Sequence, residues 1–220
     1  MLAGVGMGNM FINMIGLTPA WGLHSALETL VSQDYGCGKY ELCGIHLWRS
    51  RIVLVIMYIP LSMLLLNADT ILVALKQDPE VAAYTIEYIR AYLPGVILMA
   101  FIDGQRKYLN MMNLTTGPMT AILISVCIHV FLSWYFVWKL ELGIIGTGYA
   151  SCITNFCNYL FLIIISFSSE EVRKTMALPD KRAISGIGGY LKMGAPVVFM
   201  SAVEFWVYDI MIIMAGYIGV

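Results

Sequence analysis

The stretch PVVFMSAVEFWVYDIMIIMAG, residues 196–216, has the length and the apolar content of a helix that crosses a membrane. A hydrocarbon core about 30 Å thick requires about 20 apolar residues of α-helix. Two acids interrupt the stretch, Glu204 and Asp209. A charged side chain at the bilayer centre costs roughly 2.5 to 3.5 kcal/mol on insertion scales, so an acid at that depth indicates a function.

The rest of the chain has the same apolar character. Of its 220 residues, 60% are hydrophobic and 12% are charged, whereas a soluble domain carries about 25% charged residues. We therefore predict an all-α integral membrane protein. Six predicted transmembrane helices are long enough to cross the bilayer, at residues 2–32, 50–75, 82–103, 118–138, 144–167 and 190–218.

The basic residues are distributed unevenly between the predicted loops. The loops after the first, third and fifth predicted spans contain ten of them, whereas Lys76 and Lys139 are the basic residues on the opposite side and Arg90 lies inside the third span. Cytoplasmic loops of membrane proteins carry the excess of Lys and Arg. The side with ten basic residues is therefore predicted to be cytoplasmic.

Polar residues recur at helical spacing on the first and fifth predicted spans. Steps of three and four residues place them in one sector of each helix. They either hydrogen-bond to neighbouring helices in lipid or line a water-filled cavity, and the sequence leaves both interpretations open. The candidates for a cavity lining are Asn9, Asn13, His24, Ser151, Asn155 and Asn158.

Glu204 is predicted to lie near the middle of the membrane. It follows Lys192 by twelve residues, which corresponds to about 18 Å of helix. Ser201 and Tyr208 share its helix face, whereas Asp209 is rotated by about 140° and points elsewhere. Because desolvation disfavours the charged form of a carboxyl, Glu204 is predicted to bind and release a proton or a cation. The alternative is a protonated acid that is hydrogen-bonded between helices.

Other kinds of site are not indicated. The five cysteines show no CxxC pair and no His/Cys spacing of a metal site. Neither a nucleotide-binding loop nor a nucleophile elbow is present. We therefore expect no enzyme, no metal, no cofactor and no nucleic-acid partner.

Several segments resemble one family of transporters. GLHSALETLVSQDYGCGKYELCGIHLWRS (22–50), QDPEVAAYTIEYIRAYLPG (77–95) and LGIIGTGYASCITNFCNY (142–159) resemble successive segments of the multidrug and toxic compound extrusion (MATE) family. PVVFMSAVEFWVYDI (196–210) is similar to the seventh-helix motif of the eukaryotic branch, in which an acid, an aromatic pair and a second acid follow a proline.

The resemblance implies a partial MATE-type helical bundle. The six spans match the second to seventh helices of the family, so the first helix and most of the second lobe are missing. Residues 1–168 would form a partial N-terminal lobe of five spans, 169–189 a cytoplasmic loop between the lobes, and 190–220 the first helix of the C-terminal lobe. Missing helices or partner subunits would complete the fold.

The resemblance also implies a secondary antiporter. Such a protein exports organic cations or other amphipathic solutes through the bilayer in exchange for H⁺ or Na⁺. Its coupling and substrate-binding residues would be Glu204, Asp209, Trp206 and Tyr208. The expected location is a plasma or organelle membrane.

The alternative is a truncated MATE-like protein that does not transport and serves as a structural subunit of a larger membrane complex, for example in the inner mitochondrial membrane. The mass of the intact polypeptide separates these two hypotheses.

Overall fold

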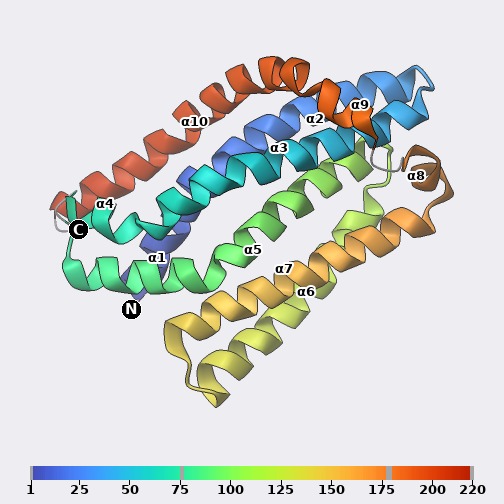
Figure 1. Cartoon of the computed structure of the whole chain (residues 1–220). Coiled ribbons are helices and arrows are strands. Elements are labelled where there is room, and N and C mark those ends of the chain that lie inside the picture. The colour runs from blue at the N-terminus through green and yellow to red at the C-terminus, as the bar shows by residue number, and fades with distance from the viewer. Residues whose placement is uncertain (1, 75–76, 177–179, 219–220) are drawn as a thin grey trace.

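The computed structural model describes residues 2–74, 77–176 and 180–218, and every regular element in these ranges is a helix (Figure 1). This confirms the predicted all-α class. The elements are α1 (Leu2–Phe11), η1 (Ile12–Leu17), α2 (Thr18–Gly36), α3 (Tyr40–Leu66), α4 (Ala68–Ala74), α5 (Pro79–Met111), α6 (Thr116–Trp134), η2 (Tyr135–Lys139), α7 (Gly143–Ser168), α8 (Glu170–Thr175), α9 (Lys181–Ser185) and α10 (Ile187–Ile218), where η marks a π-helix.

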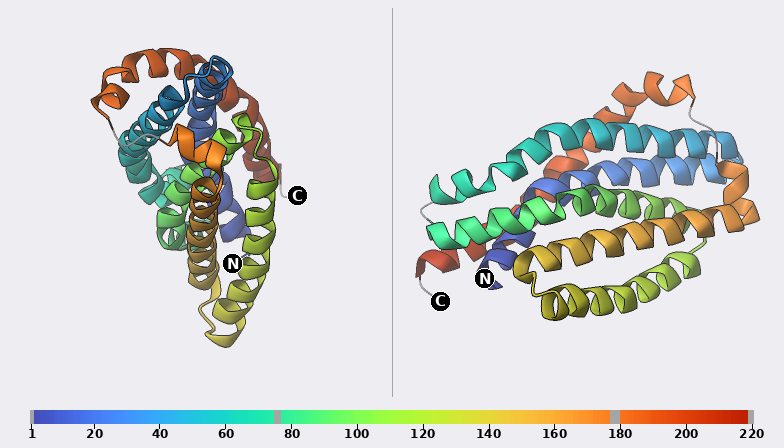
Figure 2. Two further views of the ribbon diagram at one scale, coloured as in Figure 1. Left: turned by 90° about the vertical axis from the view of Figure 1, so that its right-hand side faces the viewer. Right: turned by 60° about the horizontal axis from the view of Figure 1, so that its bottom comes forward.

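The long helices lie side by side in one bundle (Figures 1 and 2). Helix α5 contacts α1, α2, α3 and α7, so it lies at the centre of the packing. Helix α6 packs on α7 at one edge, and α10 packs along α2 at the other. Two clusters of buried apolar side chains fill the interior, one around Leu54 and Ile89 and the other around Leu27 and Leu109.

Four helical segments of the described chain are long and apolar enough to cross a membrane. They are Tyr40–Leu66, Pro79–Met111, Thr116–Lys139 and Gly143–Ser168. Helices suit a bilayer because their backbone donors and acceptors pair within the segment.

Some predicted boundaries are wrong. The helix predicted at 50–75 begins at Tyr40 and ends at Leu66, because Asn67 caps it and α4 then starts a separate short helix. The last helix, predicted to begin at residue 190, begins at Ile187, and the predicted connection before it contains the short helices α8 and α9.

The first helical segment contains a π turn that the sequence spacing does not reveal. The backbone N–H of Thr18 donates to the carbonyl of Asn13, five residues earlier, and the Thr18 hydroxyl donates to the same oxygen at 2.8 Å. Pro19 follows, and its ring has no N–H and crowds the carbonyl four residues before it. A π turn adds one residue and rotates the helix faces on its two sides relative to each other.

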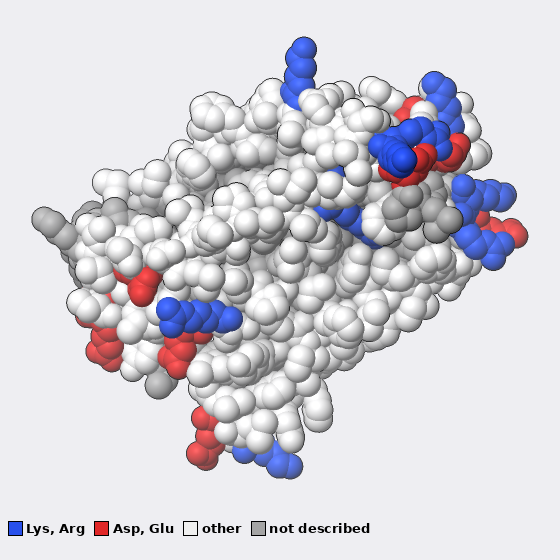
Figure 3. Space-filling view, viewed as in Figure 1, with Lys and Arg blue, Asp and Glu red and all other residues white. Residues whose placement is uncertain are grey.

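Charged side chains gather at the two ends of the bundle (Figure 3). At one end α2, α5 and α7 finish, α3, α6 and α10 start, and α8 and α9 lie across it (Figure 1). We call this the basic end, because the ten basic residues of the first, third and fifth connections lie on its side of the helices. The α6–α7 turn, with Lys139, lies at the opposite end.

Candidate functional site

A polar pocket lies between α5, α6 and α7. Its volume is about 300 Å³, and three of the residues predicted to line a cavity, Ser151, Asn155 and Asn158, contribute to its wall from α7. The other polar lining residues are Tyr92 of α5, Ser125 and His129 of α6, and Thr154 of α7. The sequence predicted one wall of this polar pocket and missed the other two.

Hydrogen bonds order the polar pocket and leave one acceptor open. The Asn155 amide donates to the Tyr92 hydroxyl and to the Gly95 carbonyl, each at 3.0 Å. The side-chain oxygen of Asn158 is buried and has no hydrogen-bond partner among the described residues. An unmade hydrogen bond at a buried acceptor costs about 1 to 3 kcal/mol. A solute that brings an N–H or O–H group into the pocket would recover that free energy.

His129 is held in one tautomer at the α6–α7 contact. The Thr154 hydroxyl donates its single hydrogen to the Ala150 carbonyl at 2.8 Å, so it accepts from His129 Nδ1 at 3.1 Å. His129 Nε2 then carries the lone pair and accepts from the Ser133 hydroxyl at 3.4 Å. The ring serves both as a helix contact and as part of the pocket wall.

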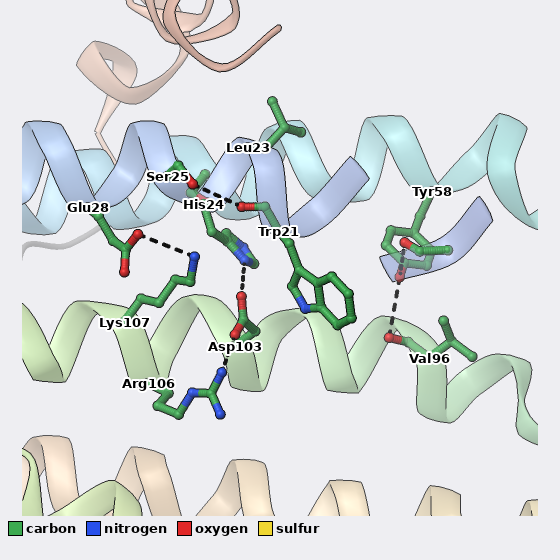
Figure 4. A network of polar contacts seen from close by, with 12 residues as sticks. Trp21, Leu23, His24, Ser25, Glu28, Tyr58, Val96, Asp103, Arg106 and Lys107 are labelled. Carbon is green, nitrogen blue, oxygen red and sulfur yellow. Dashed lines mark hydrogen bonds and ion pairs between the residues drawn. The ribbon is translucent and has the colours of Figure 1, made fainter. Parts of the chain in front are cut away.

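His24 does not line the polar pocket. It is fully buried between α2 and α5, where Nδ1 donates to Asp103 Oδ2 at 2.9 Å (Figure 4). Arg106 Nη2 donates to the other Asp103 oxygen at 2.6 Å, and Lys107 pairs with Glu28 at 3.3 Å beside them (Figure 4). These contacts connect α2 to α5. His24 therefore hydrogen-bonds to a neighbouring helix, which is one of the two interpretations that the sequence left open.

The structure also separates Asn9 and Asn13 from His24. Both asparagines are exposed, and Asn9 Oδ1 accepts from the Tyr88 hydroxyl at 3.0 Å. Asn13 lies within the π turn η1, Asn9 precedes it and His24 follows it, so these three residues do not lie on one face of a regular α-helix. A constant 3.6-residue period places all three on one side only if the helix is regular throughout.

Helix α10 carries the predicted acids and aromatics. The Glu204 side chain is exposed, and so is Tyr208 at 65%. Trp206 Nε1 donates to the Met14 carbonyl of η1 at 3.1 Å. Asp209 lies on the helix, but its side chain is outside the described residues.

Phe205, which follows Glu204 in the sequence, makes an aromatic contact with Trp21 of α2. The rings of Phe205 and Trp21 are 5.2 Å apart, tilted at 55°. Glu204 therefore lies on a segment of α10 that faces α2 and η1 through aromatic side chains. None of the described residues of α10 lines the polar pocket, so the structure places Glu204 and the pocket in different parts of the bundle.

Comparison with known proteins agrees with this arrangement. The MatE family model matches residues 1–135. The chain is 29% identical over 215 residues to Protein DETOXIFICATION 12 of Arabidopsis thaliana, covering 98% of this chain and 45% of that protein. It is 29% identical over 219 residues to Multidrug and toxin extrusion protein 2 of Pongo abelii, covering 100% of this chain and 38% of that protein.

A solved structure shows the same fold. The crystal structure of the eukaryotic MATE transporter AtDTX14 superimposes with a TM-score of 0.91 at 26% identity, covering 98% of this chain and 48% of that one. The chain thus spans about half the length, or less, of the proteins that it matches. These matches confirm the predicted family, and its members are transporters rather than enzymes. The chain belongs to the MatE family of multi-pass membrane transporters.

Proposed function

We propose that the chain forms part of a secondary antiporter that exports organic cations or other amphipathic solutes in exchange for H⁺ or Na⁺ by alternating access. Family membership supports the transport class. The observation that carries the proposal is Glu204, an exposed carboxyl in the middle of the apolar stretch 196–216 of α10. Because the chain spans about half of its relatives, further helices, in the same polypeptide or a partner, complete the transporter.

In this proposal the chain crosses the membrane six times. Four of the crossings are the four candidate spans, and the other two are the continuous helix α1–η1–α2 and helix α10. Residues 1–168 form the five spans of an N-terminal lobe, 169–189 connect the lobes, and 190–220 begin the second lobe. The excess of Lys and Arg puts the basic end in the cytoplasm. A plasma or organelle membrane suits an exporter.

The chemistry of the exchange rests on one carboxylate. Glu204 binds either a proton or the cationic group of the solute, and one displaces the other. Phe205 and Trp206, beside it in the sequence, and Trp21 on α2 present aromatic faces, to which organic cations are attracted. The Tyr208 hydroxyl supplies a further polar contact, and Asp209 supplies a second negative charge for the coupling.

Uptake of a fluorescent organic cation by membrane vesicles under an imposed pH gradient tests this proposal. Glu204→Gln keeps the size and polarity of the side chain but cannot exchange a proton. We expect it to abolish uptake driven by the gradient. Glu141→Gln removes an equal charge from an exposed position in the α6–α7 turn, so it should transport like the wild type.

Uptake that Glu204→Gln leaves unchanged would contradict the coupling role. If the wild-type protein shows no gradient-driven uptake in its complete assembly, the antiporter proposal fails as a whole. The chain would then be the structural subunit that the sequence left as the alternative.

A further inference from the structure

A groove on the outer face of the bundle combines one cation with aromatic and apolar side chains. It lies between α3, α5 and α7 and has a volume of about 410 Å³. Its lining includes Trp48, Arg51, Val55, Ile56, Phe101 and Tyr159. This α3–α5–α7 groove shares no lining residue with the polar pocket.

Arg51 is positioned at the groove by a hydrogen bond and by a contact with an aromatic ring. Its Nη2 donates to Gln105 Oε1 at 2.8 Å, and the Gln105 amide donates to the Ser166 hydroxyl at 2.7 Å. Both of these partners are buried. The guanidinium also lies 5.0 Å from the centre of the Trp48 ring. These contacts fix the position of the charge and supply neutral groups around it.

Arg51 has no acidic partner in the described part of the chain. Three other cations of the basic end do have one, since Arg106 pairs with Asp103, Lys107 with Glu28, and Arg182 with Glu41. None of the described ion pairs includes Arg51. A partly desolvated arginine without a counter-ion is unfavourable, so the structure provides half of an ion pair.

The groove changes from polar to apolar along the membrane normal. Helix α3 starts at the basic end, so Trp48 and Arg51 precede Val55 and Ile56 on the way into the bilayer, and Arg51 lies roughly 6 Å of helix before Val55. Val55 is 46% exposed and Ile56 is 58% exposed. An amphiphile with an anionic head at the membrane surface and an acyl chain below it matches this order.

We propose that the α3–α5–α7 groove is a binding site for one anionic phospholipid of the leaflet at the basic end. The guanidinium of Arg51 donates to the phosphate, for which its planar donors are suited. Trp48 and Tyr159 flank the head group, as aromatic side chains do at membrane interfaces. The upper part of an acyl chain lies along Val55, Ile56 and Phe101. The site does not depend on whether the chain transports.

Quenching of Trp48 fluorescence by brominated lipids reports which lipid lies in the α3–α5–α7 groove. The protein is reconstituted in phosphatidylcholine vesicles in which either phosphatidylcholine or phosphatidylglycerol carries bromine near the carbonyl end of its chains. The contribution of Trp48 is obtained by subtracting the emission spectrum of Trp48→Phe from that of the wild type. We expect phosphatidylglycerol to be preferred at Trp48 by about fivefold, the factor for one arginine near an anionic lipid surface.

Variants separate a specific site from general attraction. Arg51→Gln should remove the preference, whereas Lys139→Gln, which deletes an exposed cation at the opposite end, should keep it. Arg51→Lys keeps the charge without the planar fork and should retain a smaller preference, so it serves if Arg51→Gln does not fold. Equal quenching by the two lipids in the wild type would overturn the proposal. A preference that survives in Arg51→Gln, or is undiminished in Arg51→Lys, would overturn the role of Arg51.

Discussion

His24 and Asp103 show how a polar pair is accommodated inside the bundle. His24 is fully buried, and Gly104 allows the ring to lie against α5, because a Cβ at that position would be 2.8 Å from His24 Nε2. Asp103 is 5% exposed and accepts from both His24 and Arg106. The carboxylate is therefore the link on which the contact between α2 and α5 depends at this depth.

We predict that Asp103→Ala destabilises the protein by about 3 kcal/mol, because removing one partner leaves the other polar groups buried and unpaired. Reversible unfolding in mixed detergent micelles measures the loss. Glu87→Ala changes an exposed acid on the same helix and should be close to neutral. If both variants lose the same stability, the pair contributes nothing specific.

The sequence did not predict the importance of Asp103, and the reason is physical. The third span was predicted to end at residue 103, with Arg106 and Lys107 in a loop, whereas α5 continues to Met111. A charged cluster near a span end is usually solvated, and only the position of α2 shows that this one is buried. Contacts between helices cannot be predicted from the sequence of each helix alone.

Among the elements, α2 and α10 make an unusually close contact. A Cβ on Gly22 would lie 2.5 Å from the Val198 Cα and 2.7 Å from its backbone nitrogen. Near this crossing the Tyr190 hydroxyl donates to the Leu23 carbonyl at 2.7 Å. Small residues permit such approach between helices in membranes.

Gly22→Ala should therefore separate α10 from α2, because the new methyl group meets backbone atoms that cannot turn aside. We expect a loss of about 1 to 3 kcal/mol, as for other overpacked contacts. Cross-linking between cysteines introduced on the two helices should fall in parallel with stability. Gly36→Ala is the control on the same helix, since nothing lies within 4 Å of a Cβ there. Equal effects of the two alanines would contradict this view of the crossing.

Helix α9 is attached to α3 by Arg49. Its Nε and Nη2 donate to the carbonyls of Ala183 and Arg182, at 3.1 and 2.8 Å, and its Nη1 donates to His46 Nδ1 at 2.8 Å. The Arg182 side chain pairs with Asp180 in the segment before α9 and holds the pKa of that carboxyl below its usual range. The stability that this contact contributes is therefore fully present above the unfolded pKa of Asp180. It is lost as the pH falls through the lower pKa of the folded state.

We predict that Arg49→Ala and Gly186→Ala have effects that do not add. A Cβ at Gly186 would lie 2.1 Å from the present position of Arg49 Nη2, so the glycine variant displaces the same guanidinium. Hydrogen exchange of the α9 amides should rise about tenfold in either variant, since a hydrogen bond to a charged group contributes roughly 1.5 kcal/mol. The double variant should exchange no faster than Arg49→Ala. Gly188→Ala, in open space, should behave as the wild type, and additive effects would show that the two sites are independent.

At the scale of the whole molecule, composition and motif order were sufficient to predict the helical class and the family. An apolar window is a property of a single helix, so the sequence was sufficient to predict the four candidate spans. Their end points were predicted less accurately, because a helix end depends on capping, as at Asn67 after α3. The polar pocket was predicted only on α7, since Tyr92 and His129 acquire their roles from neighbours. The π-helix η1 interrupts the period of the polar residues on the first helix, and a periodicity argument that assumes a regular helix does not predict this.

Labelling with a membrane-impermeant maleimide tests the six-span arrangement. Cys37 is exposed beside the turn at the end of α2, at the basic end, whereas Lys139 lies at the opposite end. In a protein that keeps only Cys37, we expect labelling of cells only after permeabilisation. In a protein whose single cysteine comes from Lys139→Cys, we expect labelling of intact cells. The excess of Lys and Arg determines this direction, so labelling of Cys37 from outside would reverse the orientation, and labelling of both from one side would exclude a bundle that crosses the bilayer between these two ends.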